Sequence, residues 1–76
     1  MSIQEQMKMD MTKNLASLLM EDNSELTMEQ ALSIVINSDT YLRLQNNNAQ
    51  LFHQSPLYVY DFIKSEIKIG KIALIL

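Results

Sequence analysis

The sequence has no cysteine, one glycine, one proline and one histidine among its 76 residues. Without cysteine the chain can form neither a disulfide framework nor a thiolate metal site. Loops that cradle phosphate groups need several glycines, whereas Gly70 stands alone. One histidine with scattered acids offers no metal-ligand spacing. We therefore predict a protein with no metal, no cofactor and no catalytic residues.

Long apolar runs and positive charge are also scarce. The longest apolar run covers residues 72–76, whereas a membrane span needs roughly 20 residues. Met1–Asp10 lacks the apolar core of a secretory signal. Nine acids against six bases give a net charge of −3, which disfavours nucleic acid as a partner because phosphate neutralisation dominates that affinity. We expect a soluble, cytoplasmic protein that does not enter a membrane.

Hydrophobic residues make up 47% of the chain, and in its first half they follow a helical period. Their three- and four-residue steps predict a first helix over about 3–21. Its expected apolar face consists of Ile3, Met7, Met11, Leu15, Leu18 and Leu19. After a break at Asn23-Ser24, Thr27 and Gln30 form a capping-box pattern that starts a second helix over 28–37. Its expected apolar face consists of Met28, Ala31, Leu32, Val35 and Ile36.

Two later helix starts share the pattern Ser-x-x-Tyr, at Ser38–Tyr41 and Ser55–Tyr58. A serine hydroxyl before a helix accepts a hydrogen bond from a free N–H of the first turn. These starts predict a short helix over 39–46 and a fourth helix over 56–69. Gly70 follows the fourth helix and is well placed as its left-handed cap.

The connector between the last two helices contains Leu51 and Phe52, which are available to fill the core. No two-residue hairpin turn is visible, and short loops join neighbouring helices. The sequence therefore predicts an all-α fold, a small orthogonal bundle of three main helices plus one short helix. This bundle forms a single domain over residues 1–76, with residues 71–76 as an apolar terminal segment.

Glu66 falls inside the apolar arc of the predicted fourth helix. A carboxylate in that position must be paired, protonated or lifted to solvent at the helix end. One interpretation is a tuned acid or a carboxylate that binds a partner. The other is structural, with a salt bridge to Arg43 or Lys8 or with simple exposure, and we favour it.

His53, the only histidine, precedes the last helix at a position where a general base could sit. A small enzyme would use His53 together with Glu66. However, the nearby hydroxyl of Ser55 is explained by helix capping, and no orienting acid lies at a recognisable spacing. We interpret His53 as a polar loop residue and rank the enzyme hypothesis third.

Residues 27–46 have the layout of a helix, a tight joint and a second helix, as in DNA-binding helix-turn-helix units. The second of these helices begins with Asp39 and carries Arg43 as its only base, and the joint lacks glycine. These features disfavour DNA binding, so a DNA-linked regulator that uses this unit is only our second hypothesis.

The first hypothesis is a non-catalytic protein–protein interaction module. Its motivation is the surplus of apolar residues and the missing catalytic sets. The best single piece of sequence evidence is the apolar segment that follows Gly70, because an exposed apolar segment favours association. The segment either folds back over the bundle or pairs with another chain, and the sequence leaves both open. We expect a protein partner or self-association, for instance a dimer. The candidate interaction residues are Ile72, Leu74, Ile75, Leu76, Glu66 and Tyr58.

About half of the chain, residues 31–66, resembles a small bacterial domain family of unknown function. The matching positions are Ala31-Leu32, Ser38, Tyr41, Leu44, Leu51-Phe52, Gln54-Ser55-Pro56, Tyr58-Val59-Tyr60 and Glu66. Members of that family are short and helical, and some are encoded beside toxin-like or ADP-ribosyltransferase-like proteins. The resemblance implies an antitoxin-like or accessory binding role and transfers no catalytic residue. The asparagines at 46–48 and the apolar end depart from the family pattern.

Overall fold

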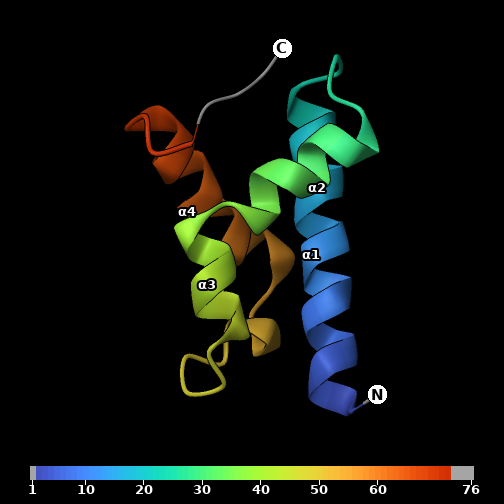
Figure 1. Cartoon of the computed structure of the whole chain (residues 1–76), viewed down its shortest axis with the longest axis vertical. Helices are drawn as coiled ribbons and strands as arrows, with labels where there is room; N and C mark the ends of the chain where they lie inside the picture. Colours follow the sequence, from blue (N-terminus) through green and yellow to red (C-terminus); the bar gives the residue numbers. More distant parts are fainter. Residues whose placement is uncertain (1, 73–76) are drawn as a thin grey trace.

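The computed structural model describes residues 2–72, and all regular secondary structure in this range is helical (Figure 1). The α-helices are α1 (Ile3–Asp22), α2 (Met28–Ile36), α3 (Asp39–Gln45) and α4 (Pro56–Lys68). A 3-10 turn, η1 (Leu51–His53), lies in the connector before α4. The all-α prediction is confirmed, and the expected ends of α2, α3 and α4 lie one residue too far, at the capping residue of each helix.

Each α-helix begins with a hydroxyl side chain that accepts a hydrogen bond from the N–H three residues later. Thr27 and Gln30 form the expected reciprocal capping box, with N–O distances of 2.9 and 3.2 Å. Ser38 and Ser55 cap α3 and α4 as expected, at 3.0 and 3.2 Å. Ser2 caps α1 in the same way, and the sequence analysis did not anticipate this cap.

The core lies between the four helices and is filled from every element. Figure 1 shows α1 running along one side of the molecule, with α2 lying across its upper part and α3 and α4 on the other side. The buried apolar side chains are Met11, Leu15, Ala16, Leu19, Leu26, Ala31, Ile34, Val35, Leu44, Leu51, Phe52, Val59, Tyr60, Ile63 and Ile72. Leu51 and Phe52 fill the core from η1, as their position in the connector suggested.

Two of the expected apolar faces need correction. Ile3 is 79% exposed because the first turn of α1 extends beyond the elements that pack on it (Figure 1). On α2 the buried residues are Ala31, Ile34 and Val35, whereas Met28 and Ile36 are exposed. The face of α2 that points inward is therefore rotated toward Ile34, which the sequence analysis had left off that face.

Gly70 ends α4 in a left-handed conformation, with φ +83°. Its N–H donates to the Ile67 carbonyl at 3.1 Å, and the Lys71 N–H donates to the Glu66 carbonyl at 2.9 Å. These two bonds form a Schellman motif, which reverses the chain and returns Ile72 to the core. No helix among the described residues combines the length and the apolar character that crossing a membrane requires.

Tyr60 connects α4 to the C-terminal end of α1. Its ring is buried, and its hydroxyl donates to Oδ2 of Asp22 at 2.6 Å. Burial raises the pKa of Tyr60 well above its ordinary value of 10.0. The hydrogen bond to Asp22 and the negative charges of Asp22 and Glu21 raise this pKa further, because each disfavours a phenolate.

Replacing Gly70 with alanine should lower the free energy of unfolding by about 1 kcal/mol. The expected loss comes from the left-handed backbone alone, since a Cβ at Gly70 would meet no atom within 4 Å. Urea unfolding of the whole chain measures it. Gly70→Asn serves as the control, because asparagine tolerates this conformation better and should lose less. Equal stability of Gly70→Ala and the unmodified protein would contradict this reading of the helix end.

Stability should fall as the pH rises above about 10, with a slope near 1.4 kcal/mol per pH unit from Tyr60. The unfolded chain releases this proton near the ordinary pKa, whereas the folded chain retains it, so alkaline pH favours unfolding. Urea unfolding between about pH 9 and pH 11 should show a shallower pH dependence for Tyr60→Phe than for the unmodified protein. If the free energy of unfolding has the same pH dependence in the two proteins, then Asp22 and burial do not raise the pKa of Tyr60.

Candidate functional site

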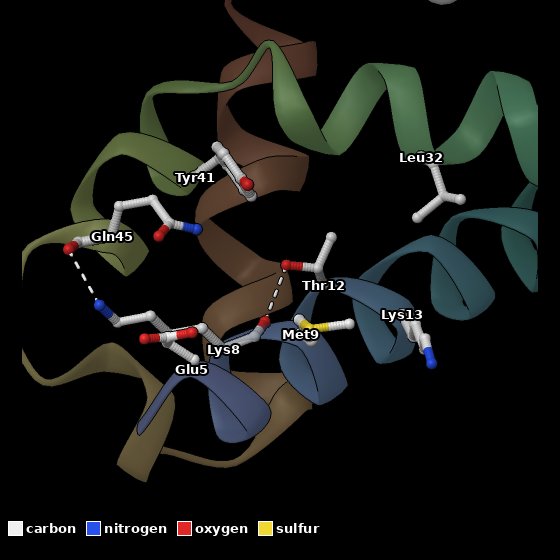
Figure 2. A pocket seen from close by; sticks show the side chains of 8 residues that line it. All are labelled: Glu5, Lys8, Met9, Thr12, Lys13, Leu32, Tyr41 and Gln45. Carbon is white, nitrogen blue, oxygen red and sulfur yellow. Dashed lines mark hydrogen bonds between the residues drawn. The ribbon is translucent and has the colours of Figure 1, made fainter. Parts of the chain in front are cut away.

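A hollow of about 370 Å³ lies between α1, α2 and α3, and we call it the groove (Figure 2). Its walls consist of Glu5, Lys8, Met9, Thr12 and Lys13 from α1, Leu32 from α2, and Tyr41 and Gln45 from α3. Figure 2 shows Leu32 and Tyr41 reaching in from above and Met9 and Thr12 from below. Three helices that are separate in the sequence thus form one concave surface.

The middle of the groove is apolar. Met9 remains 42% exposed, and Leu32 and Tyr41 are partly buried against the core. The Thr12 hydroxyl donates back to the Lys8 carbonyl at 2.8 Å, so its polar group is satisfied within α1 and its methyl group faces the hollow (Figure 2). A ligand in the groove would therefore meet a thioether, a methyl group, a leucine and an aromatic ring.

Two lysines of α1 flank this apolar patch, and Figure 2 shows the Lys8 ammonium turned toward Gln45 and the Lys13 side chain directed away from Leu32. The Lys8 ammonium donates to the Gln45 carbonyl at 3.1 Å and to Oδ1 of Asn47 at 2.6 Å, and it lies 5.6 Å from the centroid of the Phe52 ring. All of these groups are neutral, so none of them forms an ion pair with Lys8. The ion pairs among residues 2–72 involve other lysines, and Lys13 forms none of them.

α3 is held at both ends, and this fixes one wall of the groove. At its N-terminus, the Glu66 carboxylate accepts hydrogen bonds from the Asp39 N–H at 2.7 Å, from the Thr40 N–H at 3.1 Å and from the Thr40 hydroxyl. Lys71 adds an ion pair to Asp39 at 3.2 Å. At its C-terminus, Lys8 binds the Gln45 carbonyl. A helix of this length depends on such external partners for its position.

Glu66 is thus engaged inside the chain, with only 8% of its surface exposed. Its partners lie in the first turn of α3 and are not Arg43 or Lys8, the two partners that the sequence had suggested. The Arg43 guanidinium lies instead 4.7 Å from the centroid of the Phe62 ring. The carboxylate in the apolar arc is satisfied by three donors, which explains how it can be buried.

His53 lies on η1 with an exposed side chain, and its ring centroid is 4.5 Å from that of Phe52. The described hydrogen bonds of the Glu66 carboxylate all go to α3, and the hollow beside Glu66 is lined by residues of α3 and α4 with Ile69 and Lys71, without His53. The structure therefore does not bring these two residues into one site. Within residues 2–72, no group of three or more carboxylate and imidazole side chains comes together as a metal ion would require.

The other candidate interaction residues have separate places. Tyr58 is exposed on α4 and meets the Phe62 ring edge-on, with centroids 5.3 Å apart. Ile72 is buried in the core of its own chain, so the terminal segment begins by folding back. Leu74, Ile75 and Leu76 lie outside the described residues. Whether these residues fold back or associate with another chain therefore stays a question from the sequence.

The groove was not predicted from the sequence. One signal was present, since Met28, Leu32 and Ile36 repeat at four-residue steps and were all assigned to the core face of α2. A face that broad exceeds what one helix can bury, and part of it remains exposed. The contribution of Tyr41 and Met9 to the same surface depends on how three helices cross, and no local pattern carries that information.

Replacing Glu66 with alanine should lower the free energy of unfolding by about 3 kcal/mol, because the buried N–H and hydroxyl of Thr40 and the partly buried N–H of Asp39 lose their acceptor. Glu66→Gln keeps one acceptor oxygen and should lose about half as much. Glu25→Ala, which removes an exposed carboxylate between α1 and α2, is the matched control and should stay within about 0.5 kcal/mol. Urea midpoints measure all three. An equal effect of Glu25→Ala and Glu66→Ala would contradict the anchoring role.

Comparison of the chain with protein-family models, with curated proteins and with solved structures gave no match.

Proposed function

We propose that this protein is a non-catalytic protein–protein interaction module that acts through the groove between α1, α2 and α3. The proposal rests chiefly on one observation, that apolar side chains from three helices line a preformed hollow in which Met9 remains exposed. Covering such a surface with a partner removes apolar area from water, at roughly 25 cal/mol per Å². Isolated exposed apolar residues need no explanation, but a concave group of them is typical of an interaction site.

The apolar surface extends beyond the groove along α2. Met28 and Ile36 lie one turn before and after Leu32 on the same flank of the helix, and both are exposed. Ile36 retains half of its surface in contact with solvent. This stripe borders the groove and supports an interaction surface larger than the hollow itself.

The proposal also covers the partner, the arrangement of the helices and the role that the sequence predicted. The partner is another protein or a second copy of the chain, the helices form an orthogonal bundle, and the role is antitoxin-like or accessory, as the resemblance over residues 31–66 implies. The candidate interaction residues Tyr58, Leu74, Ile75 and Leu76 stay predictions from the sequence. The role is non-catalytic, because the residues available for catalysis, His53 and Glu66, have separate neighbours.

A DNA-linked regulator that uses residues 27–46 is the alternative, and the geometry supports it less. In a helix-turn-helix unit the first turn of the second helix contacts base edges. Here the Asp39 and Thr40 N–H groups bind Glu66, and Arg43, the only base of α3, lies over the Phe62 ring.

Site-specific photo-crosslinking tests the interaction module. A photoreactive residue in place of Met9 should give a discrete protein adduct in cells of the source organism, because position 9 lies in the contact surface. The same residue in place of Leu57 is the control, since Leu57 is an exposed apolar residue on α4 outside the groove. Adducts at position 57 that equal those at position 9, or none at position 9, would contradict the proposal.

A further inference from the structure

From the charges on its walls, we infer that the groove binds an acidic amphipathic helix of another protein. The bound segment places apolar side chains between Met9, Leu32 and Tyr41 and directs carboxylates toward Lys8 and Lys13. This inference rests on the proposed function and specifies the chemistry of the partner.

Most of the positive charge of residues 1–63 lies on the walls of the groove. Residues 1–63 contain eight acids and three bases, and two of the three bases, Lys8 and Lys13, line the groove. The third, Arg43, lies over the Phe62 ring. The groove walls thus carry two positive charges against the one negative charge of Glu5, in a chain that is acidic as a whole, and charge complementarity of this kind selects partners.

Neither Lys8 nor Lys13 takes part in the described ion pairs. The acceptors of Lys8 are a carbonyl and an amide oxygen, so its charge is not cancelled. The described ion pairs use Lys64 and Lys71 and leave Lys13 out. Glu5 is the one acid on the groove walls, and it lies in the first turn of α1, where the partial positive charge of the helix end offsets it.

The groove has a length and a position that suit a short helix. Along α1 the groove extends from Glu5 to Lys13, which corresponds to about 12 Å, or roughly two turns of a docked helix. Residues 2–72 contain no strand, so this part of the chain offers no sheet edge to which a partner could add a strand. An apolar channel between helices that is flanked by two lysines fits a helix that has an apolar stripe flanked by acids.

Nucleic acid fits this surface poorly, because two lysines neutralise too few phosphates for a useful affinity. A second copy of the chain is the other protein occupant, and the experiment below separates it from a heterologous helix.

The test uses the whole chain with isotope-labelled methionine methyl groups and two synthetic peptides of about 14 residues. Both peptides carry leucines at three- and four-residue steps, and the flanking positions are all glutamate in one and all lysine in the other. The glutamate peptide should shift the methyl signal of Met9 and the ring signals of Tyr41. The lysine peptide should bind about tenfold more weakly or not at all. Added salt should lower the affinity of the glutamate peptide for the groove.

Two matched pairs of variants locate the binding. Lys13→Ala should lower the affinity for the glutamate peptide about three- to fivefold, as expected for an exposed ion pair. Lys68→Ala removes the same charge from α4 and should change this affinity less than about twofold. Met9→Gln should lower the affinity for the glutamate peptide about tenfold, whereas Leu57→Gln, at an exposed position on α4, should have little effect on it. All four positions are exposed, so the fold is expected to persist.

The outcomes separate this inference from the proposed function. Equal binding of the two peptides, or equal effects of Lys13→Ala and Lys68→Ala, would overturn the acidic partner. If neither peptide binds and the chain instead dimerises with Met9 at the interface, the occupant is a second copy, and the interaction module survives without this inference. If neither peptide binds and position 9 gives no crosslink, both proposals fail.

Discussion

The arrangement of this small protein depends on one buried carboxylate. Glu66 accepts hydrogen bonds from the Asp39 N–H, the Thr40 N–H and the Thr40 hydroxyl, and so joins the last turns of α4 to the first turn of α3. Burial of a carboxylate is costly without such donors. With them, the charge lies at the N-terminus of a helix, where the partial positive charge of the free N–H groups favours it.

The consequence for the surface is a preformed groove. α3 has only seven residues and would not form or hold its place alone. Glu66 and Lys71 hold its N-terminal end and Lys8 its C-terminal end, so Tyr41 and Gln45 are fixed opposite Met9 and Thr12. A partner that enters a site of this kind does not have to order it first, which lowers the cost of binding.

Local chemistry made much of the fold predictable from the sequence. The caps at Thr27, Ser38 and Ser55 each act within three residues, and Gly70 acts within the turn that it ends, so neighbouring residues carry the information. The position of Glu66 in an apolar arc also marked it as unusual. Its partner could not be read in the same way, because α3 lies more than 25 residues earlier in the chain.

The remaining features depend on how the helices cross. Met28 and Ile36 share a broad apolar arc with Ala31 and Val35, and only the packing of α2 on α1 decides which side is buried. The groove combines single residues from three helices with lysines that sequence analysis regards as ordinary surface charges. Such a site becomes visible only when the helices are placed in space.

The most direct test of the account is amide hydrogen exchange in the first turn of α3. In an ordinary helix the first N–H groups have no partner within the helix and exchange quickly. If Glu66 anchors α3, the Asp39 and Thr40 amides will be protected to about the level of buried Leu44 in the same helix. Exchange as fast as that of Met28 and Glu29, the corresponding amides of α2, would show that α3 is not held and that the groove is not preformed.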